Sequence, residues 1–304
     1  MHDTQRSDSS PELDERLALM RVCFTTPPTA SAALSYDPAS GTAYAPTQHE
    51  QRRHWEALCL LLDAWVERGI ALGIELEAAE RWLSGCSDLV RIAPSHWYCD
   101  VTYQEWVDSW TAWTVRVGSV TRLRAAPHPS WRLVRAIALH HELADAEIEQ
   151  SFCSFLGMAQ VPGLFLIREP DHRRLDQRFF QALAGSTAFA SLRHLRISQH
   201  HVDDRALSWL ARWPGLQLLR VLDISEGSMS AWGIGALLGS AFFGGLEQLR
   251  LTSCGLNDAA ATALAAGSAL AGLRMLDLRW NAIGEAGRQA LAHAPHLGQA
   301  ELLL

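Results

Sequence analysis

The sequence predicts an α/β solenoid, with short parallel strands on the inner side and helices on the outer side. Two observations carry this prediction. Segments with the pattern L-x-x-L-x-[LI] recur at intervals of 27 residues, beginning at Leu192, Leu219, Leu246 and Leu273. Each segment is followed by apolar residues eight positions apart, such as Leu256 and Leu264, with helix-forming alanines between them. Strand, turn, helix and return therefore fit within one repeat.

The repeats extend beyond these four segments in both directions. Val134–Leu139 fits the strand pattern. Leu164–Ile167 fits it loosely, with Glu169 where an apolar residue is expected. The next strand after Leu273 is expected at Leu297–Leu302, cut short by the end of the sequence. We therefore expect about six repeats and a partial last strand within residues 126–304.

The residues before the repeats divide into two parts. Residues 1–48 contain many prolines and small residues, which predicts a poorly ordered segment with a short helix over Glu12–Cys23. Residues 49–125 are expected to form a helical, tryptophan-rich domain that caps the solenoid. Trp106, Trp110 and Trp113 would lie on one helical face there, packed against the first repeat or exposed as a binding patch.

Composition limits the classes of partner. The formal net charge of −7 predicts that nucleic acid is not a partner. No apolar run approaches the ~18 residues of a membrane span. The polar N-terminus lacks a signal-peptide pattern, and the six cysteines form no C-x-x-C pair, so we expect a cytoplasmic protein with reduced thiols.

All 26 basic residues are arginines. The absence of lysine has two interpretations: codon bias in a GC-rich bacterial genome, or escape from machinery that modifies or cleaves at lysine. In either case, no lysine-dependent catalysis is available.

The repeats resemble leucine-rich repeats of the ribonuclease-inhibitor type. The pattern L-x-x-L-x-L-x-x-[N/C]-x-L is complete in Leu246–Leu256, where Cys254 takes the polar position, and in Leu273–Ile283, where Asn281 takes it. His200 and Gly227 occupy that position in the other two clear repeats and are expected not to form the usual side-chain bonds to neighbouring backbone. The resemblance implies protein–protein recognition on the concave face.

The N-terminal region resembles a small bacterial domain that accompanies such repeats. Leu61–Gly69, with the sequence LLDAWVERG, is similar to the ADWLEERGD helix of that repeat-companion domain. Ala126–Leu139 is similar to its junction with the first repeat. This resemblance implies no enzymatic activity.

A row of charges is expected on the concave face, because strand side chains alternate between the two sides of a sheet. The row is Arg196, Asp223, Arg250, Asp277 and Glu301. Its alternating signs predict a self-neutralising ladder of about 0.2–1 kcal/mol per pair. The alternative is a partner that replaces these pairs with its own charges.

The predicted contact site lies at the C-terminal end of this face. Met275, Arg279 and Trp280 should cluster there, and Trp and Arg dominate binding hot spots. The competing interpretation is that Trp280 packs against the last strand and caps it. The predicted partner-binding residues are Trp280, Arg279, Met275, Arg250, Asp277, Asp223 and Arg196.

A second cluster is rich in histidine. Its members fall near equivalent turns of the first three repeats: His140, His141, Glu142, Asp171, His172, His200 and His201. We expect a solvated, pH-sensitive patch rather than a zinc site, because the ligands would come from turns in irregular register. No metal or cofactor is predicted.

No catalytic residue is predicted, since the sequence lacks hydrolase, metalloprotease and phosphate-loop motifs. The function expected is a non-enzymatic adaptor or scaffold that binds another protein through the concave leucine-rich face. The alternative is a regulatory or inhibitory subunit, or a cleavable substrate, in a bacterial proteolytic or defence cascade. The lysine-free composition and residues 25–48 motivate that alternative.

Overall fold

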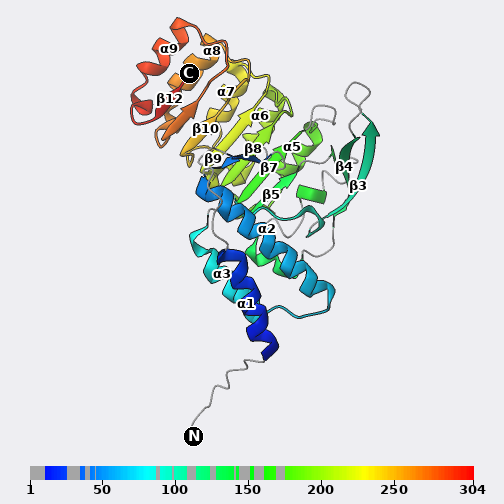
Figure 1. Cartoon of the computed structure of the whole chain (residues 1–304). Coiled ribbons are helices and arrows are strands. Elements are labelled where there is room, and N and C mark those ends of the chain that lie inside the picture. Colours follow the sequence, from blue (N-terminus) through cyan, green and yellow to red (C-terminus); the bar gives the residue numbers. More distant parts are fainter. Residues whose placement is uncertain are drawn as a thin grey trace.

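The computed structural model confirms an α/β leucine-rich repeat solenoid (Figure 1). It describes residues 11–25, 35–37, 42–44, 46–86, 90–97, 99–107, 114–123, 128–139, 142–143, 151–153, 161–168 and 175–304. The inner layer is a seven-stranded parallel sheet in the order β12-β11-β10-β9-β8-β7-β5. Its strands are β5 (Ala136–Leu139), β7 (Gly163–Ile167), β8 (His194–Ser198), β9 (Val221–Ser225), β10 (Gln248–Arg250), β11 (Met275–Asp277) and β12 (Glu301–Leu303).

Helices cover the outer side of this sheet. They are α5 (Gln177–Ala184), α6 (Asp204–Leu210), α7 (Ala231–Leu238), α8 (Asp258–Ala266) and α9 (Glu285–Ala292). Short 3-10 helices lead from helix to strand: η6 (Pro214–Leu218), η7 (Ser268–Leu270) and η8 (Pro295–Leu297). Asp176, Asp203, Ser230 and Asn257 cap successive helices, each accepting a backbone N–H from the first turn. The polar residue before each of these four helices, α5 to α8, therefore fixes where the helix begins.

The leucine positions face the core and hold the strands in register. One inward row runs Ile137, Leu164, Leu195, Leu222, Leu249, Leu276 and Leu302. All of them except the partly buried Leu302 are buried. Because a slip of one residue would turn every leucine to the opposite side, burial of this row fixes the alignment of all neighbouring side chains.

The register corrects two sequence expectations. Leu164 pairs with Ile137 and Leu195, so Val161, rather than Leu164, is the first apolar residue of its repeat. At the C-terminal end Glu301 pairs with Met275, while Leu297 lies in η8. Because Ala300 is small and apolar, it was taken for a core position, and the last motif was placed two residues too early in the sequence.

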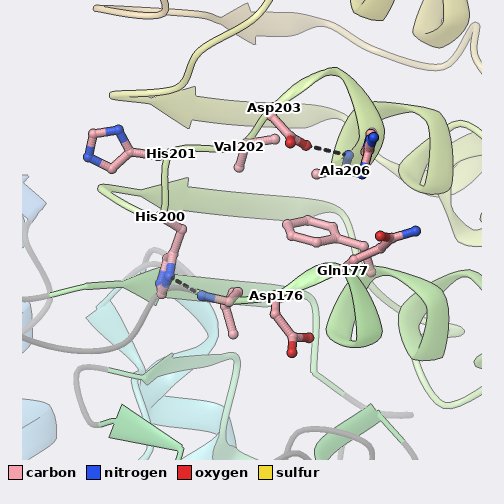
Figure 2. Close-up of a pocket in the computed structure, with 10 residues that line it drawn as sticks. Asp176, Gln177, His200, His201, Val202, Asp203 and Ala206 are labelled. Atoms are coloured by element: carbon pink, nitrogen blue, oxygen red, sulfur yellow. Dashed lines mark hydrogen bonds between the residues drawn. The ribbon is translucent and has the colours of Figure 1, made fainter.

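Asn281 joins consecutive repeats through the backbone. Its Oδ1 accepts the N–H groups of Cys254 (2.9 Å) and Leu256 (3.0 Å), and its Nδ2 donates to carbonyls including that of Leu251 (2.7 Å). His200 does the same in part, since its Nδ1 accepts the N–H of Leu175 at 3.1 Å (Figure 2). The expectation that His200 makes no such bond was therefore wrong. An imidazole nitrogen can accept a backbone N–H as the side-chain oxygen of Asn281 does.

The N-terminal helices lie against the β5 end of the sheet, opposite β12 (Figure 1). They are α1 (Pro11–Thr25), α2 (Pro46–Glu67) and α3 (Ile74–Trp82), followed by η1 (Leu83–Gly85), η3 (Ser95–Trp97) and η4 (Pro129–Leu133). The indole of Trp55 donates to the carbonyl of Ile92 at 2.7 Å, and Ile92 forms a parallel bridge with Ala136. Residue 92 therefore extends the solenoid sheet towards α2.

Asp63 on α2 ties together the segments around this junction. Its carboxylate accepts the indole N–H of Trp97 at 2.5 Å and lies 2.9 Å from Nε2 of His96. His128 stacks on Trp97, with ring centroids 4.2 Å apart, and its Nε2 lies 3.5 Å from Asp63. Burial acts to raise the pKa of Asp63, but these partners outweigh it and lower the pKa. Asp63 is thus a structural carboxylate, not a solvated surface one.

The expectation of helix throughout residues 49–125 was wrong for two segments. Residues 99–107 and 114–123 form the antiparallel strands β3 (Cys99–Val107) and β4 (Thr114–Leu123), and β6 (Glu142–Leu143) pairs with β4. These segments are rich in valine, threonine and aromatic residues, which favour strands. Trp106 pairs with Val115 in this ladder, whereas Trp110 and Trp113 lie outside the described residues.

The first 48 residues include more regular structure than expected. The short helix over Glu12–Cys23 is confirmed as part of α1. Ser35–Asp37 (β1) and Thr42–Tyr44 (β2) pair as antiparallel strands within the segment that was expected to be poorly ordered. No described helix is long and apolar enough to span a membrane.

Replacing Asn281 with alanine should lower the free energy of unfolding by about 2–4 kcal/mol, because partly buried N–H and C=O groups lose their partners. Urea unfolding followed by circular dichroism measures the change. Gln289→Ala is the control, since within the described part of the chain its exposed amide bonds to Glu285 alone, and its loss should cost under about 0.5 kcal/mol. Equal losses in the two variants would contradict a structural role for Asn281.

Candidate partner-binding surface

The seven residues predicted to bind a partner line a single hollow of about 250 Å³ on the concave side of the sheet. The remaining residues that line it are Ser225, Thr252 and Leu303. The hollow crosses strands β8 to β12 and the turns that follow them. Ser225 and Thr252 were not among the residues predicted to bind a partner, although they follow the charge row by two positions, and the register of the last strand hid the position of Leu303.

The expected charge row forms on adjacent strands from Arg196 to Asp277. Register aligns Arg196, Asp223, Arg250 and Asp277. Nε of Arg196 and Nη1 of Arg250 each lie 3.7 Å from Oδ2 of Asp223. Leu303, rather than Glu301, is the next member of the row. The proposed fifth charge therefore belongs to the adjoining row, beside Met275.

Asp277 takes its closest partner from its own chain segment. Arg279 donates to it twice, from Nε to Oδ1 at 2.9 Å and from Nη2 to Oδ2 at 2.7 Å. This paired geometry is the strongest form of the arginine–carboxylate interaction. Asp277 is only 2% exposed. The alternating ladder thus stops at Arg250, because Arg279 holds the next carboxylate.

The two aspartates have opposite pKa shifts. Burial raises the pKa of Asp223, and the more distant charges of Arg196 and Arg250 do not compensate for it. Burial also acts to raise the pKa of Asp277, but the hydrogen bonds and charge of Arg279 outweigh it, so that this pKa is lowered. The direct hydrogen bonds from Arg279 thus outweigh burial at Asp277, whereas the contacts with Arg196 and Arg250 do not outweigh it at Asp223.

Trp280 lies at the rim of the hollow. Its side chain is 73% exposed, and the guanidinium carbon of Arg279 lies 5.1 Å from its ring centroid. Its φ angle is +59°, in the left-handed region. Gln199, Glu226 and Ser253 occupy the same place in the three preceding repeats and share this conformation. An indole this exposed does not pack as a cap on the last strand, so that interpretation was wrong.

Of the predicted histidine cluster, the structure describes the side chains of His200 and His201 alone, so the expectation of no zinc site stays a prediction. Burial lowers the pKa of His200 to about 3, with smaller contributions from Arg168 and His201. His200 is therefore neutral near pH 7. It is bonded to the backbone, whereas a solvated side chain was expected. His200 and His201 line a hollow of about 270 Å³. Figure 2 shows their two rings well separated. His140, His141, Asp171, His172 and the side chain of Glu142 lie outside the described residues.

A further exposed tryptophan lies on the convex side and was not singled out from the sequence. Trp232 on α7 is 61% exposed and borders a hollow of about 480 Å³ between α6 and α7. It is the second residue of α7, after the capping Ser230 and Ala231.

Comparison with known proteins matches one repeat of this chain. A family model described as leucine-rich repeat matches residues 273–292. Among solved structures, an internalin from Listeria monocytogenes is similar at 15% identity with a TM-score of 0.38. The match covers 58% of this chain and 49% of that one, so the chain spans about half its length. No curated protein matches. The family model thus covers one repeat, and the parallel ladder places the other strands in register with it.

Asparagine substitutions should separate the two aspartates. Asp277→Asn should lower the free energy of unfolding at pH 7 by about 1.5–3 kcal/mol, because charge-assisted bonds to Arg279 are lost. Asp223→Asn should leave it unchanged or raise it, because ionisation of a carboxylate with a raised pKa opposes folding. Urea unfolding at pH 7 measures both variants.

The pH dependence provides the check on this pair. The stabilisation from Asp277 is present above its unfolded pKa and is lost as the pH falls through the lowered folded pKa. Asp223 contributes in the opposite sense: its stabilisation is present at low pH and is lost as the pH rises through the raised folded pKa. A larger loss at pH 7 for Asp223→Asn than for Asp277→Asn would contradict this assignment.

Proposed function

We propose that this chain is a non-enzymatic adaptor or scaffold that binds a partner protein through the concave face, at the end marked by Trp280. The observation that carries the proposal is the combination of exposure and backbone strain at this residue. A bulky side chain with positive φ costs of the order of 1–3 kcal/mol, and the exposed indole recovers little of that through burial. A partner that covers the indole would recover it.

The lining of the hollow favours binding over catalysis. Trp and Arg are the residue types that most often dominate binding energy, and both are present at its rim. Cys254, in the turn that follows β10, is buried, and burial raises the pKa of its thiol to about 12. Such a thiol is not an effective nucleophile at neutral pH. The mechanism proposed is steric, by holding a partner against the sheet.

The finer assignments are part of the same proposal. Repeats of about 27 residues with outer helices α6 to α9 favour the ribonuclease-inhibitor type. The packing of α2 and residue 92 against the β5 end favours a repeat-companion domain that caps the solenoid over residues 49–125. Among the described residues, Cys59 and Cys254 form no disulfide, which favours a reducing compartment and supports a cytoplasmic protein.

The alternative role uses the same surface. A regulatory or inhibitory subunit of a proteolytic or defence cascade would hold its partner in the same way, and an arginine-only chain would escape modification at lysine. Incubating the bound partner with and without this chain distinguishes the roles. A change in the partner's own activity favours regulation, and no change favours a scaffold.

Replacing Trp280 with alanine should abolish partner binding while changing the free energy of unfolding by less than about 0.5 kcal/mol, because the indole is exposed and alanine keeps the Cβ that is strained at positive φ. Affinity capture from the cells that make the protein, quantified by mass spectrometry, measures binding. Thermal unfolding measures stability.

Trp232→Ala is the matched control, because it removes an exposed indole from the convex side. Proteins retained by the unchanged chain and by Trp232→Ala, but not by Trp280→Ala, are the expected result. Retention by Trp280→Ala with loss in Trp232→Ala would place the contact on α7 and reject the proposed surface.

A further inference from the structure

The concave hollow is more cationic than its sequence of alternating charges suggests. Three arginines and two aspartates line it. The arginine side chains are 27%, 37% and 46% exposed, whereas the aspartate side chains are 12% and 3% exposed. The carboxylates thus lie deep in the hollow, and the guanidinium groups reach its surface. A positive surface results on a chain whose net charge is −7.

Arg279 and Arg250 also have N–H groups available for a further partner. A guanidinium carries five N–H groups. Arg279 uses Nε and Nη2 on Asp277, and no bond from its Nη1 is found among the described residues. Arg250 donates to Gln248 at 3.3 Å and lies 3.7 Å from Asp223. A second carboxylate can therefore bind from the solvent side without displacing the first.

The cationic surface is small and bounded. Exposed Glu226 and Glu301 lie beside the hollow but do not line it. From β8 to β11 the surface spans three strand spacings, about 14 Å. An extended peptide covers that distance with four or five residues at about 3.3 Å each. Such a surface suits a short segment with two or three carboxylates, whereas a nucleic acid would demand a longer basic track.

We propose that the partner docks through a short acidic segment, whose carboxylates bind Arg250 and Arg279 while an adjacent apolar or aromatic side chain covers Trp280. This inference rests on the proposed function, because it names the chemistry of the partner at the same site. The charges set which segment is accepted, and the indole supplies most of the buried apolar area.

Selection from a random 12-residue peptide library displayed on phage tests the proposal, with the full chain as bait. Recovered peptides should be enriched in Asp and Glu within a window of about five residues, next to an apolar residue. Synthetic peptides measured by fluorescence anisotropy should bind about tenfold more weakly after Glu→Gln changes, since charge-assisted bonds are lost.

Protein variants complete the test. Arg250→Gln should weaken the selected peptides by roughly fivefold to tenfold, because one charged donor is lost while Arg196 still neutralises Asp223. Arg178→Gln on α5, which removes an exposed arginine from the outer side, should leave binding unchanged. The Glu→Gln peptides are measured on the unchanged chain, so their result stands even if Arg250→Gln fails to fold.

The outcomes distinguish this inference from the proposed function. Neutral or basic peptides whose binding is lost in Trp280→Ala would overturn the acidic assignment and leave the binding surface standing. Peptides insensitive to Trp280→Ala would overturn the inference, and the capture comparison with Trp232→Ala then decides the proposed function. A single-stranded DNA dodecamer that competes at equal concentration would overturn the assignment to a peptide.

Discussion

The buried row of leucines sets the alignment of the whole solenoid. Because strand side chains alternate, packing Leu222, Leu249 and Leu276 inward forces the residues on either side of them onto the concave face. Equivalent residues of successive repeats then stack at the strand spacing. The charge row, the hollow and the recurring left-handed turn all follow from this one constraint.

The turn after each strand explains why Trp280 is unusual. Four repeats adopt positive φ at this position, and three of them place Gln199, Glu226 or Ser253 there. The fold imposes the conformation, so the strain at Trp280 comes from the choice of side chain and not from an irregular backbone. The same turn directs that side chain to the rim of the hollow, where a partner can reach it.

The regular repeats could be predicted from sequence because a period of 27 residues leaves little freedom in register. The sequence-based prediction failed at two places, and each failure has its own physical cause. Trp106 belongs to a segment whose aromatic spacing suits a helix, yet its valines and threonines favour a strand, and pairing with β4 decides the outcome. Glu301 was placed in the wrong row because Ala300 mimics a core residue, and only pairing with Met275 reveals the register.

The candidate site was predictable in position but not in electrostatic character. Spacing places Arg250 beside Asp223, and from that alone a neutral ladder follows. The spacing of residues in the sequence does not show how deeply each side chain is buried. Asp277 is buried and held by Arg279, two residues along the same segment, so the arginines dominate the surface. On an acidic chain, such a local positive field would attract an acidic partner segment selectively.

Site-specific photo-crosslinking in the cells that make the protein tests the central claim most directly. A benzophenone amino acid replaces Thr252, which lines the concave hollow, or Ala236, which lines the convex hollow beside Trp232. The account predicts a discrete crosslinked partner from position 252, lost when Trp280 is also changed to alanine, and none from position 236. A partner crosslinked from position 236 and absent from position 252 would contradict it.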